Sequence, residues 1–248
     1  MMLLVDAGNT RIKWAIVEGA AWRADGALDH DEVSELATLA IGPYKPSRAV
    51  CVSVAGDRLS QAITETLAGA GLKTEWFRSS PACCGVSNGY EQPLQLGADR
   101  WAALVGARSL HGSACLVVCA GTATTIDLLD ADGSFQGGVI LPGEHLMRQA
   151  LAGNTAQLPF AEGRYVPQPR NTTDAIISGC RQAQIGAIER MFGMISDRPH
   201  AVCLLAGGGA GALEAHLPIP VRRVENLVLH GLAVAATKHP CLRPGSAQ

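Results

Sequence analysis

The sequence predicts an α/β protein built from two lobes, and three observations support that prediction. The chain has 248 residues, which suits two compact domains of roughly 100–130 residues each. Hydrophobic residues make up 48% of the chain and aromatic residues only 4%, a composition that favours tightly packed layers of helices and sheets. Short apolar runs alternate with segments of helical periodicity along the sequence. We therefore expect mixed sheets flanked by helices.

The first half of the chain opens with two apolar runs separated by a polar turn. The runs are residues 2–5 and 12–17, and the turn is Asp6-Ala7-Gly8-Asn9-Thr10, a pattern typical of a β-hairpin. Residue spacing then predicts helices at 32–40 and 57–70, strands at 48–54 and 73–77, and an irregular loop at 79–97. A helix expected at 99–110 would connect the two lobes.

The second half begins with the same pattern. Strands are expected at 114–118, 125–129, 134–140 and 202–205, helices at 143–152, 171–192, 212–216 and 226–237, and a loose tail after His239. Leu3-Leu4-Val5-x-Ala7-Gly8 and Leu116-Val117-Val118-x-Ala120-Gly121 follow the same order of residue types. This echo predicts an internal duplication, with one lobe at residues 1–110 and the other at residues 111–248.

Charge, hydropathy and cysteine pattern argue against several other classes of protein. A formal net charge of −2 leaves no broad basic surface for nucleic acid. No apolar run reaches the ~18 residues of a membrane-spanning helix, so we expect no membrane partner. The eight cysteines contain no C-x-x-C pair, several lie within apolar runs, and the chain does not open like a signal peptide. We therefore expect buried, reduced thiols and a cytoplasmic location rather than disulfides.

Two glycine turns, one in each half, are candidate phosphate-binding sites. Gly8 lets backbone amides approach an anion, and Asn9 and Thr10 add side-chain donors. Lys13 lies on the returning strand and can reach a phosphate. The segment Gly121-Thr122-Ala123-Thr124-Thr125 offers small residues and hydroxyls after a strand in the same way. Either turn alone also fits an ordinary hairpin or edge strand, and it is their pairing that indicates a bound nucleotide.

Two carboxylates and a glycine triplet complete the candidate site. Asp6 ends the first strand and can hold Mg²⁺, which prefers oxygen ligands. Asp99 begins the helix at 99–110, where unpaired amides stabilise its anion, and it can accept a proton from a hydroxyl. Arg100 can pair with a carboxylate or phosphate, although a helix-capping Asp beside a solvated Arg fits the same residues. Gly207-Gly208-Gly209 either lies against a base or ribose or forms a flexible turn.

Six motifs, in order along nearly the whole chain, resemble those of the type III pantothenate kinase family, part of the acetate and sugar kinase/Hsp70/actin superfamily. They are Asp6-x-Gly8-Asn9-Thr10-x-x-Lys13, Asn88-x-Tyr90-x-x-Pro93-x-x-Leu96-Gly97-x-Asp99-Arg100, Gly121-Thr122-Ala123-x-Thr125-x-Asp127 with Gly137-Gly138-x-Ile140-x-Pro142-Gly143, Asn171-Thr172-x-x-Ala175-Ile176-x-x-Gly179, Gly207-Gly208, and Asn226-Leu227-Val228-x-x-Gly231-Leu232. Cys119 departs from the family, which usually has Asp there, and Cys is a poor ligand for Mg²⁺ or K⁺.

The resemblance implies two ribonuclease H-like (actin-like ATPase) lobes and ATP-dependent phosphorylation of pantothenate, the first step of coenzyme A biosynthesis. It implies that Asp99 is the general base. The implied pantothenate-binding residues are Tyr90, Gly97, Ala98, Asp99, Arg100 and Thr172, and Thr172 would come from the partner subunit of a homodimer. The implied ATP- and phosphate-binding residues are Asp6, Ala7, Gly8, Asn9, Thr10, Arg11, Lys13, Gly121, Thr122, Gly207 and Gly208. Mg²⁺ would bind at Asp6, and K⁺ or NH₄⁺ at Asp127.

Two rival hypotheses remain open at this point. One is another small-molecule kinase of the same superfold, acting on a sugar, acetate or an N-acetylhexosamine. The other is a nucleotide-binding or regulatory relative that has lost turnover, which Cys119 would suit. Release of ADP that depends on pantothenate separates both rivals from the main prediction.

Overall fold

The computed structural model describes residues 1–160, 162–238 and 241–244, and it divides into two compact units. Unit 1 comprises Met1–Gly112, Gly133–Phe135 and Asn226–Gln248, and unit 2 comprises Ser113–Asp132 and Gln136–Glu225. The described residues from Asn226 onward therefore contact the first unit, whereas the lobe boundaries expected from the sequence assign them to the second.

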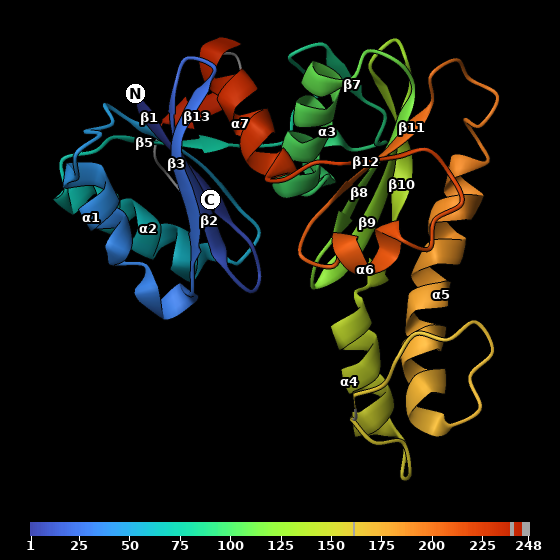
Figure 1. Cartoon of the computed structure of the whole chain (residues 1–248). Helices are drawn as coiled ribbons and strands as arrows, with labels where there is room; N and C mark the ends of the chain where they lie inside the picture. The colour runs from blue at the N-terminus through green and yellow to red at the C-terminus, as the bar shows by residue number, and fades with distance from the viewer. Residues whose placement is uncertain (161, 239–240, 245–248) are drawn as a thin grey trace. The chain divides into compact units, whose positions relative to one another are not determined.

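Unit 1 contains a six-stranded sheet with the strand order β13-β5-β4-β1-β2-β3 (Figure 1). Its strands are β1 (Met2–Ala7), β2 (Ile12–Glu18), β3 (Ala21–Leu28), β4 (Ala49–Ser53), β5 (Thr74–Phe77) and β13 (Leu242–Pro244). The β1–β2 hairpin confirms the prediction, whereas β3 was not expected. The prediction of a loose tail after His239 is wrong for β13, which pairs antiparallel with β5. His239 and Pro240 lie outside the described residues.

Helices cover both faces of this sheet (Figure 1). The 3₁₀ helix η1 (His30–Glu32) is followed by α1 (Glu35–Ile41) and α2 (Asp57–Gly69), which pack on one face around Leu3, Val5 and Ile63. On the other face lie α3 (Ala98–Leu110) and α7 (Leu227–Lys238), which contact β4 and β1. Residues of β1 alternate between the two faces because side chains of a strand point to opposite sides in turn.

Glycines let α3 and α7 approach each other closely. A Cβ added at Gly231 of α7 would overlap the carbonyl of Ala102 in α3, and one added at Gly106 would lie 2.5 Å from the carbonyl oxygen of Leu227. Since any larger residue would push the helices apart, these two positions fix where α3 lies on the sheet. The sequence motif that contains Gly231 thus has a packing role.

The expected loop at 79–97 contains short elements that the sequence pattern did not indicate. They are β6 (Ala82–Cys83), β7 (Val86–Asn88) and the 3₁₀ helix η2 (Pro93–Gln95). β6 and β7 form a hairpin whose two central residues, Cys84 and Gly85, have φ values of 52° and 84°. β7 also pairs with Ser134–Phe135, the start of β10 (Ser134–Pro142).

Unit 2 repeats the strand pattern of unit 1. Its other strands are β8 (Cys115–Ala120), β9 (Ala123–Leu129), β11 (Val202–Ala206) and β12 (Val221–Arg223), and the full strand order of this sheet is β12-β11-β8-β9-β10-β7-β6. β8 pairs antiparallel with β9 and parallel with β11, as β1 does with β2 and β4. The same topology in both units agrees with a duplication.

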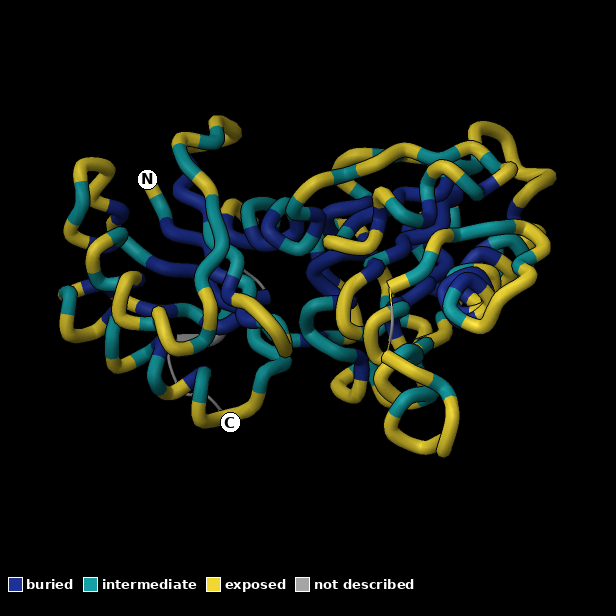
Figure 2. Tube along the Cα trace, turned by 60° about the horizontal axis from the view of Figure 1, so that its bottom comes forward, coloured by how far each residue is buried: buried dark blue, intermediate teal, exposed yellow. Residues whose placement is uncertain are grey.

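Three helices accompany the second sheet: α4 (Glu144–Asn154), α5 (Thr172–Phe192) and α6 (Ala210–Glu214). Leu116 and Val118 of β8 pack with Ile188 of α5 and Leu213 of α6 in one apolar core. Figure 2 shows that the buried residues lie along the strands within each unit, while exposed residues follow the outer turns and helix surfaces. Of the helices in the described part of the chain, none has the length and apolar character needed to span a bilayer.

The expectation that all cysteines are reduced is wrong for one pair. Cys83 and Cys241 form a disulfide with a Cα–Cα distance of 6.1 Å, within the usual range for such bonds. The two residues are separated by 158 positions in sequence, so only the pairing of β13 with β5 brings them together. The cysteines that form no disulfide are Cys51, Cys84, Cys115, Cys119, Cys180 and Cys203.

Candidate active site

The first glycine turn places a carboxylate and an ammonium group opposite each other. Asp6 on β1 and Lys13 on β2 are direct cross-strand partners, so their side chains extend from the same face of the sheet. Leu3, Val5 and Ala7 belong to the core on the face of α1 and α2. By alternation, Asp6 points to the other face, where α3 and α7 pack.

Asp99 occupies the first turn of α3. Its Oδ1 accepts a hydrogen bond of 2.7 Å from the backbone N–H of Arg100. Gly97 is the residue that precedes the helix, and a Cβ there would lie 2.8 Å from the same Oδ1. Glycine at this position therefore leaves room for the carboxylate to fold back over the helix start, where unpaired amides favour negative charge.

The charge of Asp99 acts on Asp6. Burial of the Asp6 carboxyl, and next the negative charge of Asp99, raise the pKa of Asp6 to about 7, while Lys13 acts in the opposite direction. Burial also raises the pKa of Asp99, partly offset by its backbone hydrogen bonds and by Arg100. Two partly desolvated carboxylates that repel each other form a site that favours a proton or a cation.

Arg100 and Tyr90 form the next part of the site. The Arg100 side chain is 5% exposed and donates a hydrogen bond of 2.7 Å to the Tyr90 hydroxyl. The Tyr90 ring stacks on Phe135, with ring centroids 5.5 Å apart. Asn88 holds this segment by accepting a bond from the Tyr90 N–H and donating to the carbonyl of Pro93. The structure thus brings Tyr90, Gly97, Asp99 and Arg100 together.

The tip of the first turn is open to solvent. Asn9, Thr10 and Arg11 are exposed, and Arg11 pairs with Asp29 at 3.2 Å. The contribution of Arg11 to phosphate binding stays a prediction. His30 lies with its Nε2 2.9 Å from the Gly8 carbonyl oxygen. His30 was missed by the sequence reasoning, because nothing in its local pattern indicates that η1 lies against this turn.

In unit 2, three glycine segments meet at the end of β8. A Cβ at Gly207 would overlap the backbone of Ala120, and Gly207 has a φ of 97°. A Cβ at Gly143 would overlap the carbonyl of Gly121, and the Gly143 N–H donates to the Thr122 carbonyl at 2.8 Å. The predicted phosphate residues Gly121 and Thr122 therefore lie directly beside Gly207 and the start of α4.

One face of β9 carries the remaining polar residues. Cys119 and Thr125 are cross-strand partners, and Asp127 follows on the same face because it is two residues along. Asp127 is 1% exposed and lies against Gly138, where a Cβ would overlap its carboxylate. On the opposite face, Thr124 donates a 2.6 Å hydrogen bond to Gln184 of α5. Gln184 was also missed, since its partner is 60 residues away.

Thr172 is the exposed first residue of α5. Asn171 caps the helix by accepting a hydrogen bond from the Asp174 N–H at 2.9 Å. The carboxylate of Asp174 in turn accepts a 2.7 Å bond from the Arg164 N–H, the main reason why its pKa lies below the usual value. Thr172 is therefore held on a well-ordered helix start and presents its side chain to solvent.

Comparisons with known proteins agree with this arrangement. Residues 2–193 match the model of the family described as "Type III pantothenate kinase". A type III pantothenate kinase from Aromatoleum aromaticum is 61% identical over 236 residues, covering 95% of this chain and 98% of its own. One from an Azoarcus species is 52% identical over 238 residues, covering 95% and 90%. A solved Campylobacter jejuni structure, a putative Baf family transcriptional activator, has a TM-score of 0.62 at 19% identity, covering 95% and 98%.

Two sheets flanked by helices, each with the same strand pattern, define a protein of the actin-like ATPase fold. The chain belongs to the type III pantothenate kinase family. It is accordingly an enzyme that phosphorylates pantothenate in coenzyme A biosynthesis, with ATP and pantothenate as substrates and a divalent metal accompanying ATP. The rival hypotheses of an inactive relative or another kinase are not favoured.

Proposed function

We propose that Asp99 is the general base of this enzyme and that it removes the proton from the 4′-hydroxyl of pantothenate as the γ-phosphoryl group of ATP is transferred. The observation that supports this proposal is that Asp99 begins the helix that packs on the sheet face toward which Asp6 points, and that its charge raises the pKa of Asp6. A raised pKa suits a base, because its conjugate acid must hold the proton it receives near neutral pH. Phosphoryl transfer otherwise needs positioning and charge neutralisation, which the surrounding groups can supply.

Asp6 is proposed as the Mg²⁺-binding residue. Its carboxylate is a hard oxygen donor, and its own repulsion from Asp99 would be relieved by a cation. The residues present therefore fit the metal, which in kinases neutralises charge on the ATP phosphates. The Gly8 N–H donates to the Arg11 carbonyl at 3.1 Å and closes the turn. The segment Ala7-Gly8-Asn9, with Thr10 and Lys13, would contact the phosphate oxygens. Arg11, which follows the turn, is also proposed to contact the phosphates.

Arg100 and Tyr90 are proposed to orient pantothenate. The Arg100 guanidinium is already fixed by Tyr90, so little side-chain entropy is lost when it binds a polar group of the substrate. Gly97 and Ala98 would contribute backbone contacts beside Asp99. Thr172 is proposed to complete the site from the partner subunit of a homodimer, for which its exposed position at the start of α5 is suited.

Unit 2 carries further residues that are proposed to bind the nucleotide. The amides near Gly121 and Thr122 would contact phosphates, and Gly207 and Gly208 would lie against the base or ribose. Asp127 is proposed to bind the monovalent cation, K⁺ or NH₄⁺, because it is the buried carboxylate on the face that also carries Thr125. The sulfur of Cys119 on that face is too soft a ligand to bind Mg²⁺ or K⁺ well.

The variant Asp99→Asn tests the role of Asp99. It keeps the size and the helix-start hydrogen bond but cannot accept a proton, so we expect kcat to fall by about 10²-fold or more with an unchanged circular dichroism spectrum. A matched control is Glu35→Gln, which neutralises an exposed carboxylate in the first turn of α1 and should leave kcat unchanged. Turnover of Asp99→Asn near that of the control would remove Asp99 from this role.

A second experiment tests the proposed cation and substrate together. Release of ADP should depend on added pantothenate, and it should be faster with K⁺ or NH₄⁺ than with Na⁺ alone.

The cytoplasmic location expected from the sequence also stays a prediction. The Cys83–Cys241 disulfide is the observation that bears on it, because such bonds are rare in reducing compartments.

A further inference from the structure

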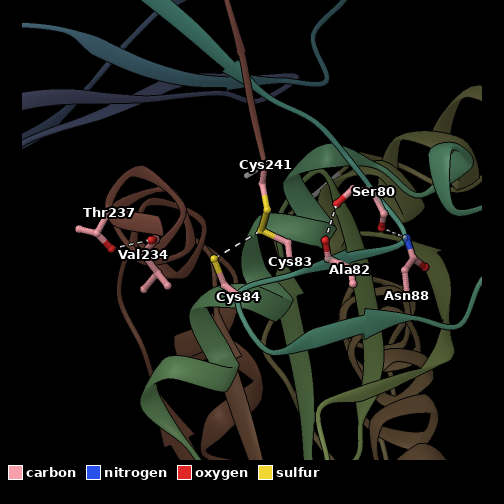
Figure 3. Close-up of a disulfide and its surroundings, with 8 residues drawn as sticks. All are labelled: Ser80, Ala82, Cys83, Cys84, Asn88, Val234, Thr237 and Cys241. Atoms are coloured by element: carbon pink, nitrogen blue, oxygen red, sulfur yellow. Dashed lines mark hydrogen bonds between the residues drawn. A yellow bond between two sulfur atoms is a disulfide. The ribbon is translucent and has the colours of Figure 1, made fainter. Parts of the chain in front are cut away.

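Three cysteine sulfurs meet in unit 1 at a place that the kinase reaction does not use. The Sγ atoms of Cys83, Cys84 and Cys241 all lie within 4.8 Å of one another. Cys83 and Cys241 are bonded, and the Cys84 Sγ lies 3.4 Å from that of Cys83. Figure 3 shows the Cys84 sulfur directed toward the disulfide. Cys83 and Cys241 are 4% and 6% exposed, and Cys84 is half-buried, so the cluster is largely shielded from water.

The fold holds these sulfurs together by two separate devices. The pairing of β13 with β5, Leu242 opposite Phe77, brings the neighbouring Cys241 to the β6–β7 hairpin. The hairpin turn itself places Cys84 at the first of two positions with positive φ, followed by Gly85. Asn or Asp is the residue favoured at that position of such a turn. Cysteine is not among the residues favoured at a positive φ. We therefore attribute its presence at this position to its sulfur atom.

We propose that Cys83, Cys84 and Cys241, in their reduced state, form a binding site for one soft d¹⁰ metal ion of the zinc type. Thiolate sulfur is the ligand class that such ions favour over hard cations. Three sulfurs bound at about 2.3 Å around a tetrahedral ion are separated by roughly 3.8 Å. The separation of 3.4 Å between the Cys84 and Cys83 sulfurs is already near that spacing. The bonded sulfurs of Cys83 and Cys241 would have to move apart to it after reduction.

The site and the disulfide are alternative states of the same atoms. Reduction of the Cys83–Cys241 bond by two small-molecule thiols, or one dithiol, gives two protein thiols and the oxidised reductant as its disulfide. Binding of one Zn²⁺ by the three thiols then forms three metal–sulfur bonds and releases three protons. Among the described residues, this is the one group of at least three His, Cys, Asp or Glu side chains with such spacing. A water molecule would complete the fourth position.

In the reduced protein, the metal would connect the same segments that the disulfide connects in the oxidised protein. Either link ties β13 to the hairpin whose second strand ends at Asn88, two residues before Tyr90. A bound ion at this point would keep the Tyr90 segment in place when the protein is reduced. The site is separate in its residues and its chemistry from the proposed Mg²⁺ position at Asp6.

Metal titration of the full chain tests this proposal. The protein is reduced with a phosphine, exchanged into oxygen-free buffer, and titrated with Zn²⁺ in competition with a coloured chelator and, separately, with Cd²⁺. We expect one Zn²⁺ per chain and one ultraviolet thiolate-to-cadmium charge-transfer band. The protein with the disulfide intact should bind at least about tenfold more weakly, because two of the three ligands are blocked. Equal Zn²⁺ affinity in the two redox states would overturn the site.

Two variants locate the ion. Cys84→Asn introduces the residue favoured at the turn and so preserves the hairpin, yet it should lower Zn²⁺ affinity by more than about tenfold, since even loss of an outer hydrogen-bond partner costs about 10–100-fold. Cys180→Ala, which removes a free buried thiol of α5 outside the cluster, should bind like the parent chain. The proposal fails if the folded, reduced parent binds no Zn²⁺, or if Cys84→Asn binds it unchanged.

Discussion

The two glycine turns of this protein share a strand pattern but differ in the chemistry they carry. In unit 1, β1 lies between an antiparallel β2 and a parallel β4, and Asp6 pairs with Lys13 and Val52. In unit 2, β8 lies between an antiparallel β9 and a parallel β11, and Cys119 pairs with Thr125 and Ala206. Asp6 and Cys119 therefore hold corresponding positions, one charged and the other neutral.

The two turns differ in the kind of group that each one gathers. The unit 1 turn gathers formal charges, namely Asp6, Lys13 and the nearby Asp99. The unit 2 turn instead gathers backbone groups, because Gly143 and Gly207 both pack against the end of β8. Its carboxylate, Asp127, lies two residues beyond the cross-strand partner of Cys119. Unit 1 therefore concentrates charged groups at its turn, whereas unit 2 concentrates close backbone contacts.

The largest effect is expected from removing the charge at the unit 1 turn. Asp6→Asn should lower kcat/KM for ATP by about 10²-fold or more, the scale on which loss of one preorganised electrostatic group is felt, and raise the Mg²⁺ concentration needed for half-maximal rate. Steady-state rates across a Mg²⁺ titration measure both quantities. Asp31→Asn, an exposed carboxylate of η1, is the control. If Asp6→Asn shows the same Mg²⁺ dependence as this control, the Asp6 carboxylate does not bind the metal.

A smaller effect, on stability rather than chemistry, is expected at the unit 2 turn. Gly207→Ala should lower the free energy of unfolding by about 1–3 kcal/mol, because the new Cβ overlaps the Ala120 backbone and φ is positive there. Gly208→Ala is the matched control, since a Cβ at Gly208 meets nothing within 4 Å. Urea unfolding of both variants measures the difference. If both unfold alike, the backbone contact that defines the unit 2 surface is not needed.

The buried Asp6 carboxylate of unit 1 should also lower the free energy of unfolding in a way that depends on pH. The folded-state pKa of Asp6 is about 7, above its ordinary value of 3.8, so the folded state binds the proton more tightly than the unfolded state. Stability from this group is therefore greatest at low pH and falls as pH rises through about 7. Without Mg²⁺, Asp6→Asn should be more stable than the parent by about 1–2 kcal/mol at about pH 8, with the gain shrinking toward about pH 4.

Thermal unfolding at several pH values, in the presence of a chelator, checks this expectation. Asp31→Asn again serves as the comparison, because its carboxylate is exposed. A stability gain of Asp6→Asn that is the same at every pH would mean that burial of the charge is not its origin.

The sequence could predict most of this site because its motifs are local. The hairpin around Gly8, the helix that starts beside Asp99 and the glycine turn at Gly121 each follow from residues close together in the chain. Their physical signals are apolar runs, helix spacing and turn residues. The resemblance of the ordered motifs to a family then supplied roles that no local signal carries.

What the sequence could not predict depends on residues that meet only after folding. The return of β13 to β5 creates the Cys83–Cys241 bond across 158 positions, and no local pattern marks that partnership. The influence of Asp99 on the pKa of Asp6 likewise requires α3 to lie on the correct face of the sheet. That placement depends on Gly106 and Gly231, whose small size matters only because another helix is there.

The smallest effect is expected from Cys119, the residue that breaks the correspondence between the two turns. Cys119→Ser replaces a soft atom by a hard one of similar shape and should change kcat by no more than about twofold, the range of a substitution of under ~0.5 kcal/mol. The reason is that Asp127, the residue proposed to bind the cation, lies on the same face with oxygen atoms of its own. Rates measured with K⁺ and with Na⁺ test this directly. A tenfold loss of activity, or loss of the K⁺ preference, would show that the unit 2 turn contributes to the chemistry through Cys119 itself.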